Sequence, residues 1–291
     1  MKIITIEDKN YPEQLKIISK PPKKIYVLGD EKILQEKSIA IIGSRNCTPY
    51  GELEAFKFSE ELTKQGLVIT SGMAVGIDSY AHKGCISQNG KTIAVLGSGF
   101  NHLYPKENTE LFKRILDTGG TVISEYAPSV EPSSDKFRQR NRIVSGLSIA
   151  TLIIEAEYRS GTTITARYAR EQGKPVFCIP NSIENRKGIG TNELLKNGAL
   201  LATNIDDILS KCNLPKKLNA KEEFKSESSI KLKINKKYKY IYDVLEKQPL
   251  TTNEISKRLK VSINELNSKL LLMEIEGLAK RVAGNSYVKI E

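Results

Sequence analysis

The chain has 291 residues, of which 39% are hydrophobic and 27% are charged. This is enough apolar material for a folded core, and it excludes a chain that is disordered throughout. Lys and Arg number 45 against 34 Asp and Glu, so the net charge is +11. No stretch approaches the roughly 18–20 apolar residues of a membrane helix, and residues 1–8 lack the apolar core of a signal peptide. We therefore expect a cytoplasmic protein without membrane insertion.

The cysteines and histidines do not suggest a metal site. No CxxC pair occurs, and the histidines stand at no recognised ligand spacing from the cysteines. These residues are Cys47, Cys85, Cys178, Cys212, His82 and His102. Residues 84–92 resemble a nucleotide-binding Walker A loop, but their spacer is one residue too long and they precede a strand instead of following one. We expect reduced thiols, no metal and no cofactor.

In chain order, residues 1–37 are too short for a domain and are expected to be a lead-in segment that packs on the main domain. Residues 38–210 alternate short β-branched runs with amphipathic stretches such as 52–64 and 163–172. The runs cover residues 39–42, 67–70, 92–96, 121–123, 149–154 and 175–179. This alternation predicts an α/β fold, an extended Rossmann-like parallel sheet with helices on both faces. Ligands of such sheets bind at the carboxyl ends of the strands.

The remaining sequence predicts a basic linker over residues 211–235 and a small winged-helix domain over 236–291. Residues 211–239 hold ten Lys against three Glu, which suits either a solvated connector or a segment with general attraction for nucleic acid. A helix is expected over 236–247, and two more are expected after the capping residues Thr251 and Ser262. Two strands joined at Gly284-Asn285 follow.

Two of the predicted strands are followed by turns that suit anions. Residues 43–45, Gly-Ser-Arg, combine close backbone approach, hydroxyl and amide donors, and a guanidinium. Residues 71–82 place Gly72 and Gly76 at a strand-to-helix junction, where backbone amides can face an anion. Asp78 and His82 lie four residues apart and could form a catalytic dyad. A local hydrogen bond that fixes the loop is the interpretation we favour.

Three later segments add cations, an aromatic ring and donors. Residues 97–106 contain a glycine turn followed by aromatic and basic residues, with Lys106 last. Residues 136–142, Lys-Phe-Arg-Gln-Arg-Asn-Arg, carry four cations and no acid, which suits phosphates held by cations and a base stacked on the ring. Residues 160–163, Ser-Gly-Thr-Thr, open a helix whose free amides favour phosphate. So many anion-binding turns at one sheet edge indicate a polyanion.

Taken together, these motifs resemble the DprA/Smf family, the DNA-processing proteins of natural transformation. The resemblance covers about residues 8–210 and, less strongly, the winged helix. It lies in residues 42–45, 71–82, 92–97, 104–105, 124–126, 137–148, 155–166 and 190–199.

The resemblance implies a non-catalytic homodimer that binds single-stranded DNA without strong sequence preference, protects it and loads the RecA recombinase onto it. The DNA-binding residues expected from the motifs and the resemblance are Gly43, Ser44, Arg45, Gly72, Lys106, Lys136, Phe137, Arg140, Asn141, Arg142, Ser160, Gly161 and Thr162. The dimer contact is expected near the end of the Rossmann-like domain, at Leu194, Leu195, Leu200 and Leu201.

Two alternatives stay open. One is an enzyme that hydrolyses nucleotide–ribose bonds, although the turn at 159–163 lacks the carboxylate that such enzymes carry nearby. The other is a winged-helix regulator that binds a specific duplex sequence. The predicted reading helix, 262–276, carries three Glu against Lys269 alone, which is unfavourable for a DNA groove. We therefore expect the winged helix to contact protein or to bind duplex weakly.

Overall fold

The computed structural model describes residues 1–158, 160–216, 238–245, 249–275, 278–282 and 286–289. Contacts divide the chain into two compact units, Met1–Lys217 and Leu218–Glu291. Residues 217–237, most of the predicted basic linker, lie outside the described residues, as does the predicted turn at Gly284-Asn285.

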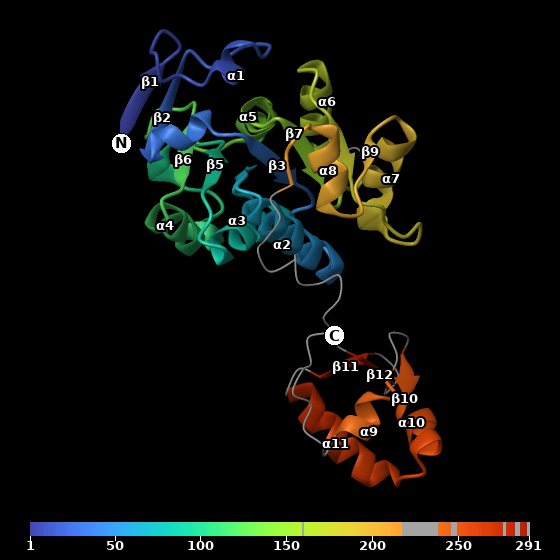
Figure 1. The fold of residues 1–291 in the computed structure, drawn as a ribbon. Helices are drawn as coiled ribbons and strands as arrows, with labels where there is room; N and C mark the ends of the chain where they lie inside the picture. The colour runs from blue at the N-terminus through green and yellow to red at the C-terminus, as the bar shows by residue number, and fades with distance from the viewer. Residues whose placement is uncertain (159, 217–237, 246–248, 276–277, 283–285, 290–291) are drawn as a thin grey trace. The chain divides into compact units, whose positions relative to one another are not determined.

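The first unit is built on a nine-stranded sheet with the order β1-β2-β6-β5-β4-β3-β7-β8-β9 (Figure 1). From β6 to β9 neighbouring strands are parallel, whereas β1–β2 and β2–β6 are antiparallel. The strands are β1 (Lys2–Thr5), β2 (Lys24–Gly29), β3 (Ser38–Ile42), β4 (Val68–Ser71), β5 (Thr92–Leu96), β6 (Thr121–Ser124), β7 (Ala150–Ile153), β8 (Val176–Cys178) and β9 (Leu200–Leu201). All six strands predicted from the sequence are present, and the Rossmann-like α/β fold is confirmed.

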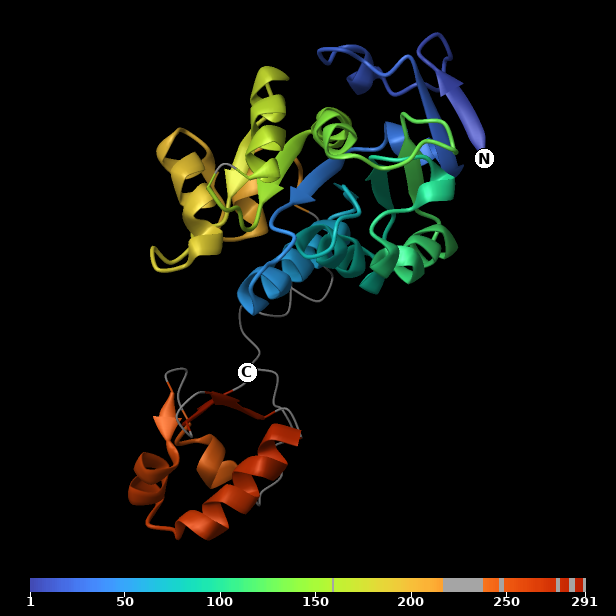
Figure 2. The same cartoon turned by 180° about the vertical axis from the view of Figure 1, so that it is seen from behind.

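Helices cover both faces of this sheet (Figures 1 and 2). They are α1 (Glu13–Lys16), α2 (Pro49–Lys64), α3 (Ile77–Ser87), α4 (Thr109–Asp117), α5 (Ser134–Leu147), α6 (Gly161–Glu171), α7 (Ile189–Lys196) and α8 (Ile205–Lys211). Short 3-10 turns span Glu31–Gln35, Phe100–His102, Lys106–Asn108 and Arg186–Gly188. Along β3, Ala40 and Ile42 pack with α5 and α6, whereas Ile39 and Ile41 pack with α2, α3 and α8. This two-sided burial explains the nearly continuous apolar runs.

The predicted lead-in segment is part of the sheet. Residues 1–37 supply β1 and β2, which extend the sheet beyond β6 as its antiparallel end. Tyr11 and Leu15 are fully buried, and the Tyr11 hydroxyl donates a hydrogen bond to the Pro22 carbonyl at 2.7 Å. The segment therefore belongs to the same core as the Rossmann-like elements. Its sequence gave little sign of this, because the two strands are short and joined by an irregular connection.

The second unit is a small helical domain with a three-stranded antiparallel sheet of order β10-β12-β11. Its elements are α9 (Lys239–Tyr242), β10 (Leu250–Thr251), α10 (Thr252–Leu259), α11 (Ile263–Ile275), β11 (Ala279–Val282) and β12 (Ser286–Lys289). Both predicted caps form: the Glu254 amide donates to Thr251 Oγ1 at 3.3 Å, and the Glu265 amide donates to Ser262 Oγ at 3.4 Å. On α11, Lys269 pairs with Glu265 at 2.5 Å, which leaves that surface with little free positive charge.

Candidate functional site

A cleft lies where the order of the strands reverses, at the carboxyl ends of β3 and β7. From β3 the order runs through β4, β5 and β6 on one side and through β7, β8 and β9 on the other. The loops that leave β3 and β7 therefore diverge, and such a point is where open α/β sheets bind ligands. A cleft of about 540 Å³ lies here, lined by the loops after β3, β4 and β7 and by α5. It collects Gly43, Ser44, Arg45, Gly72, Phe137, Arg140, Asn141, Ser160, Gly161 and Thr162 of the predicted site.

The loop after β3 is held by a buried carboxylate. Glu155 is fully buried, and its side chain accepts hydrogen bonds from the Thr48 amide at 2.9 Å and the Thr48 hydroxyl at 2.6 Å. Its carbonyl accepts the Ser44 amide at 2.8 Å. Thr48 in turn caps α2 by accepting the Gly51 amide at 3.1 Å. The loop that carries Arg45 is thus fixed at both ends.

One edge of the cleft is formed by a cation and two neighbouring aromatic rings. The Arg45 guanidinium carbon lies 5.4 Å from the centroid of the Phe137 ring, and the Tyr104 ring lies 5.4 Å from the same centroid. Phe137 packs against Gly97, where a Cβ would come within 2.5 Å of Phe137 Cδ1. Tyr104 is 47% exposed. This arrangement offers a ring face and a cation to one ligand.

Below the cleft, the buried side chains of Arg140 and Asp78 both border Gly72 and attract each other electrostatically. Arg140 is 5% exposed, and its Nη1 donates to the carbonyls of Gly72 and Val95. Asp78 Oδ2 accepts the Gly72 amide at 3.1 Å and the Ala74 amide at 3.3 Å. Burial lowers the pKa of Arg140 to about 10 and raises the pKa of Asp78. The predicted local role of Asp78 in fixing its loop is confirmed.

The alternative catalytic dyad does not form. His82 is fully buried, and its Nδ1 lies 2.7 Å from Thr92 Oγ1, not at Asp78. Burial lowers the pKa of His82 to about 3. The Thr92 hydroxyl already donates to the Ile69 carbonyl at 2.6 Å, so the neutral imidazole donates from Nδ1. This histidine is part of the core.

The opposite edge of the cleft is the beginning of α6. The Thr163 amide donates to the Ser160 carbonyl at 3.1 Å, whereas the Gly161 and Thr162 amides have no intrahelical partner, and the helix dipole makes this end positive. A Cβ at Gly161 would meet no atom within 4 Å, so the backbone is open to a ligand there. Asn141 Nδ2 donates to the Gly161 carbonyl at 3.3 Å and ties α5 to this turn. The start of α6 thus lines the same cleft as the Arg45 guanidinium.

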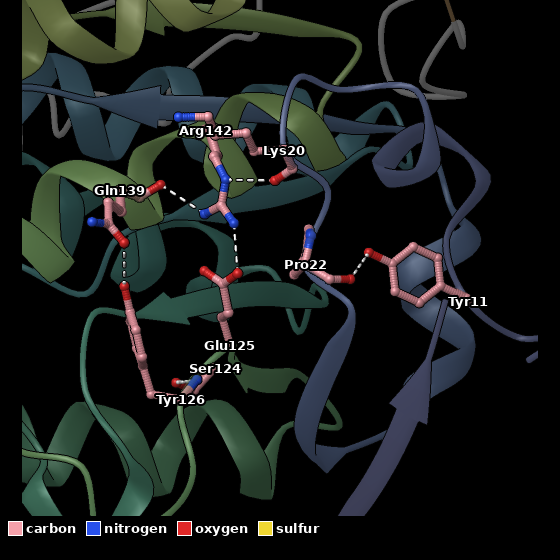
Figure 3. A network of polar contacts seen from close by, with 8 residues as sticks. All are labelled: Tyr11, Lys20, Pro22, Ser124, Glu125, Tyr126, Gln139 and Arg142. Carbon is pink, nitrogen blue, oxygen red and sulfur yellow. Dashed lines mark hydrogen bonds and ion pairs between the residues drawn. The ribbon is translucent and has the colours of Figure 1, made fainter. Parts of the chain in front are cut away.

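Three predicted DNA-binding residues do not line the cleft. Lys106 lies in the 3-10 turn Lys106–Asn108, and Lys136 lies in the first turn of α5. Arg142 is 8% exposed and points to the N-terminal segment (Figure 3). Conversely, Tyr104 and Arg138 line the cleft but were not in the predicted site. Both stood in the motifs already noted, and only the fold distinguishes the exposed side chains from the buried ones.

The four leucines expected at the dimer contact lie near one end of the sheet. Leu194 and Leu195 pack partly buried against the core. Leu200 and Leu201 form β9, whose one strand partner among the described residues is β8. Leu201 is 52% exposed. This end of the sheet therefore presents apolar surface and an unpaired strand edge.

Within the described part of the chain, no group of three or more His, Cys, Asp or Glu side chains is placed to hold a metal ion. All four cysteines are free thiols, and burial raises the pKa of Cys85 to about 11 and that of Cys178 to about 12. The helices of the described residues include none long and apolar enough to cross a membrane.

Sequence comparison agrees with this architecture. The profile of the family described as DNA recombination-mediator protein A matches residues 2–213, and a DprA winged helix domain profile matches 235–285. The chain belongs to this DNA recombination-mediator family. The resemblance inferred from the motifs, including the C-terminal winged helix, is confirmed.

Individual relatives of this family match closely. Protein Smf of Escherichia coli is 41% identical over 207 residues, 71% of this chain and 55% of that protein. DNA processing protein DprA of Bacillus subtilis is 37% identical, over 70% of this chain and 69% of that protein. The match thus spans little more than half of the E. coli relative.

Two solved structures of the family share the fold. DprA from Streptococcus pneumoniae has a TM-score of 0.69 and 36% identity, covering 75% of each chain. DNA processing protein A from Helicobacter pylori, whose structure is described for its single-stranded DNA binding mode, has a TM-score of 0.65 and 34% identity. That match covers 72% of this chain and 95% of the other.

Proposed function

We propose that this chain binds single-stranded DNA in the cleft at the carboxyl ends of β3 and β7, without strong sequence preference and without catalysis. The observation that supports it most is the stack of Arg45 on Phe137 at a cleft that also offers free amides of α6. Phosphates suit the guanidinium and the amides, and any base has a face for the ring. The family relative from H. pylori is described as binding the same class of ligand.

Family membership supports a proposal for the role in the cell. We propose that the bound strand is protected from nucleases and passed to the RecA recombinase in the cytoplasm during natural transformation. The winged-helix unit is proposed to contact a protein or to bind duplex weakly, because its α11 pairs Lys269 with Glu265.

A homodimer is also proposed, with its contact at the β9 end of the sheet. Leu194 and Leu195 pack on the core, so their replacement would disturb folding as well as assembly. Leu201 is the better probe because it is half exposed. Leu201→Glu is expected to give a monomer in sedimentation velocity, and a dimer that survives this change would place the contact elsewhere.

The experiment that tests DNA binding is an Arg45→Ala variant in fluorescence anisotropy with a labelled thymidine oligonucleotide across a salt series. Loss of one phosphate contact lowers the slope of log K against log salt by about 0.7 for single strands. Weaker binding with that smaller slope is expected. An unchanged affinity and slope would remove Arg45 from the interface, and release of free base from a nucleoside monophosphate would favour an enzyme instead.

A further inference from the structure

Helix α5 carries three arginines, Arg138, Arg140 and Arg142, and the structure gives them unequal access to a ligand. The Arg138 side chain is 65% exposed and borders the cleft. Among the described residues its ion pair is to Asp135 at 3.8 Å, and the Asp135 side chain is itself 82% exposed. A long ion pair between two exposed side chains constrains the guanidinium little. The donors of Arg138 are therefore available to a phosphate.

The donors of Arg140 are directed into the protein. This residue borders the cleft, but Nη1 donates to the carbonyls of Gly72 and Val95, at the ends of two adjacent strands. Nη2 lies beside Gly72, as does the Asp78 carboxylate: a Cβ added at Gly72 would come within 2.7 Å of Arg140 Nη2 and of Asp78 Oδ2. The guanidinium thus joins the loops beneath the cleft, and a phosphate cannot reach Nη1 without displacing these two carbonyls. Nε donates to Asn141 Oδ1 at 3.3 Å.

The donors of Arg142 are also bonded to groups of the protein, on the other side of α5 (Figure 3). Nε donates to the Lys20 carbonyl at 2.9 Å, and Nη1 donates to the Gln139 carbonyl at 2.9 Å. Nη2 pairs with Glu125 at 2.6 Å, and the residue is 8% exposed. The positive charge is therefore neutralised by Glu125, and the side chain ties α5 to the N-terminal segment and to the loop after β6.

We propose that Arg138 is the phosphate contact of α5, whereas Arg140 and Arg142 are positioning residues that hold this helix and its cleft loops in place. The assignment rests on the proposed single-stranded DNA binding. It divides the three arginines of the basic segment 136–142 by role: Arg138 meets the strand together with the Phe137 ring, and the two buried arginines set their position. Three residues of one type in one motif thus have two physical functions.

The experiment uses the full chain, a labelled thymidine oligonucleotide and anisotropy across a salt series. Arg138→Ala is expected to weaken binding and to reduce the salt slope by about 0.7. Arg167→Ala is the matched control, because Arg167 lies on α6 with the same 65% exposure, pairs with Glu171 at 3.5 Å and does not line the cleft. The control is expected to leave affinity and slope unchanged. An unchanged slope in Arg138→Ala overturns the assignment of Arg138.

Glu125→Gln tests Arg142 without removing it. If Arg142 positions α5, loss of the Glu125 charge lowers the melting temperature and weakens DNA binding at every salt concentration with the slope retained. If Arg142 instead met a phosphate, freeing it from Glu125 would tighten binding, and that result overturns its assignment.

Arg140→Gln is expected to behave like Glu125→Gln, and a slope reduced by about 0.7 would return Arg140 to the interface. Absence of binding by the unmodified chain would refute the proposed function itself, and the assignment with it.

Discussion

Breaking the buried pair beneath the cleft should destabilise the first unit strongly. Arg140 and Asp78 are 5% and 7% exposed, so each charge depends on the other and on backbone partners for its solvation. Arg140→Gln leaves the Asp78 carboxylate without its cation, and Asp78→Asn leaves the guanidinium without its anion. Removing one member of a buried pair costs about 3–5 kcal/mol.

The double variant separates the pair from its surroundings. With both charges removed, no uncompensated charge stays buried, so the loss should be smaller than the sum of the single losses by about 1–3 kcal/mol. For a unit of this size each kcal/mol lowers the melting temperature by about 2–4 °C. Each single variant should therefore melt about 6–20 °C below the parent.

Scanning calorimetry of the full chain measures this, because the larger unit contributes most of the unfolding enthalpy. Arg167→Gln on the exposed face of α6 is the control and should shift the midpoint by no more than about 2 °C. Single variants that melt within that margin would refute the idea that the pair supports the fold. So would a double variant whose loss equals the sum, since it would show no coupling between Arg140 and Asp78.

Three further predictions follow from single residues. Burial lowers the pKa of His82 to about 3, so the folded state resists protonation of this side chain. The free energy of unfolding is therefore highest above about pH 6.5 and falls as the pH drops toward 3. At pH 5 the loss is about 2 kcal/mol. Urea unfolding at pH 7 and pH 5 should show this loss in the parent and much less of it in His82→Asn. Phe137→Leu should weaken single-strand binding by about 1–3 kcal/mol with the salt slope retained, and unchanged anisotropy titrations would remove the ring from the site. Gly51→Ala should destabilise by about 1–3 kcal/mol, since its Cβ would lie 2.5 Å from Glu155 Oε2; Gly161→Ala, which meets no atom within 4 Å, should not, and equal melting temperatures would contradict this.

The sheet of the first unit could be predicted because its strands carry an unambiguous signal. The run 39–42 is apolar at every position, and the structure buries alternate residues against helices on opposite faces. The glycine turns after β3 and β4 could be placed at the cleft because parallel strands end at one edge. By contrast, β1 and β2 were missed, since short antiparallel strands at a sheet end carry little periodicity.

The segments that form the site were predicted correctly, but the individual residues that face the cleft were predicted less well. The basic segment 136–142 was correctly singled out, but composition does not distinguish Arg138, which is exposed, from Arg142, which is paired with Glu125. That difference depends on contacts with residues far along the chain, such as the Lys20 carbonyl. Tyr104 was missed for a similar reason, because its place beside Phe137 depends on how the loop after β5 packs against α5.

The central claim is that the cleft at the carboxyl ends of β3 and β7 prefers single-stranded DNA. The most direct measurement is fluorescence anisotropy of the full chain with labelled single-stranded and double-stranded oligonucleotides of equal length across a salt series, with Arg45→Ala beside the parent. The account predicts salt-sensitive binding that favours the single strand, shows little dependence on its sequence and falls in the variant. Equal or weak binding to both forms, or preference for one duplex sequence, would contradict it.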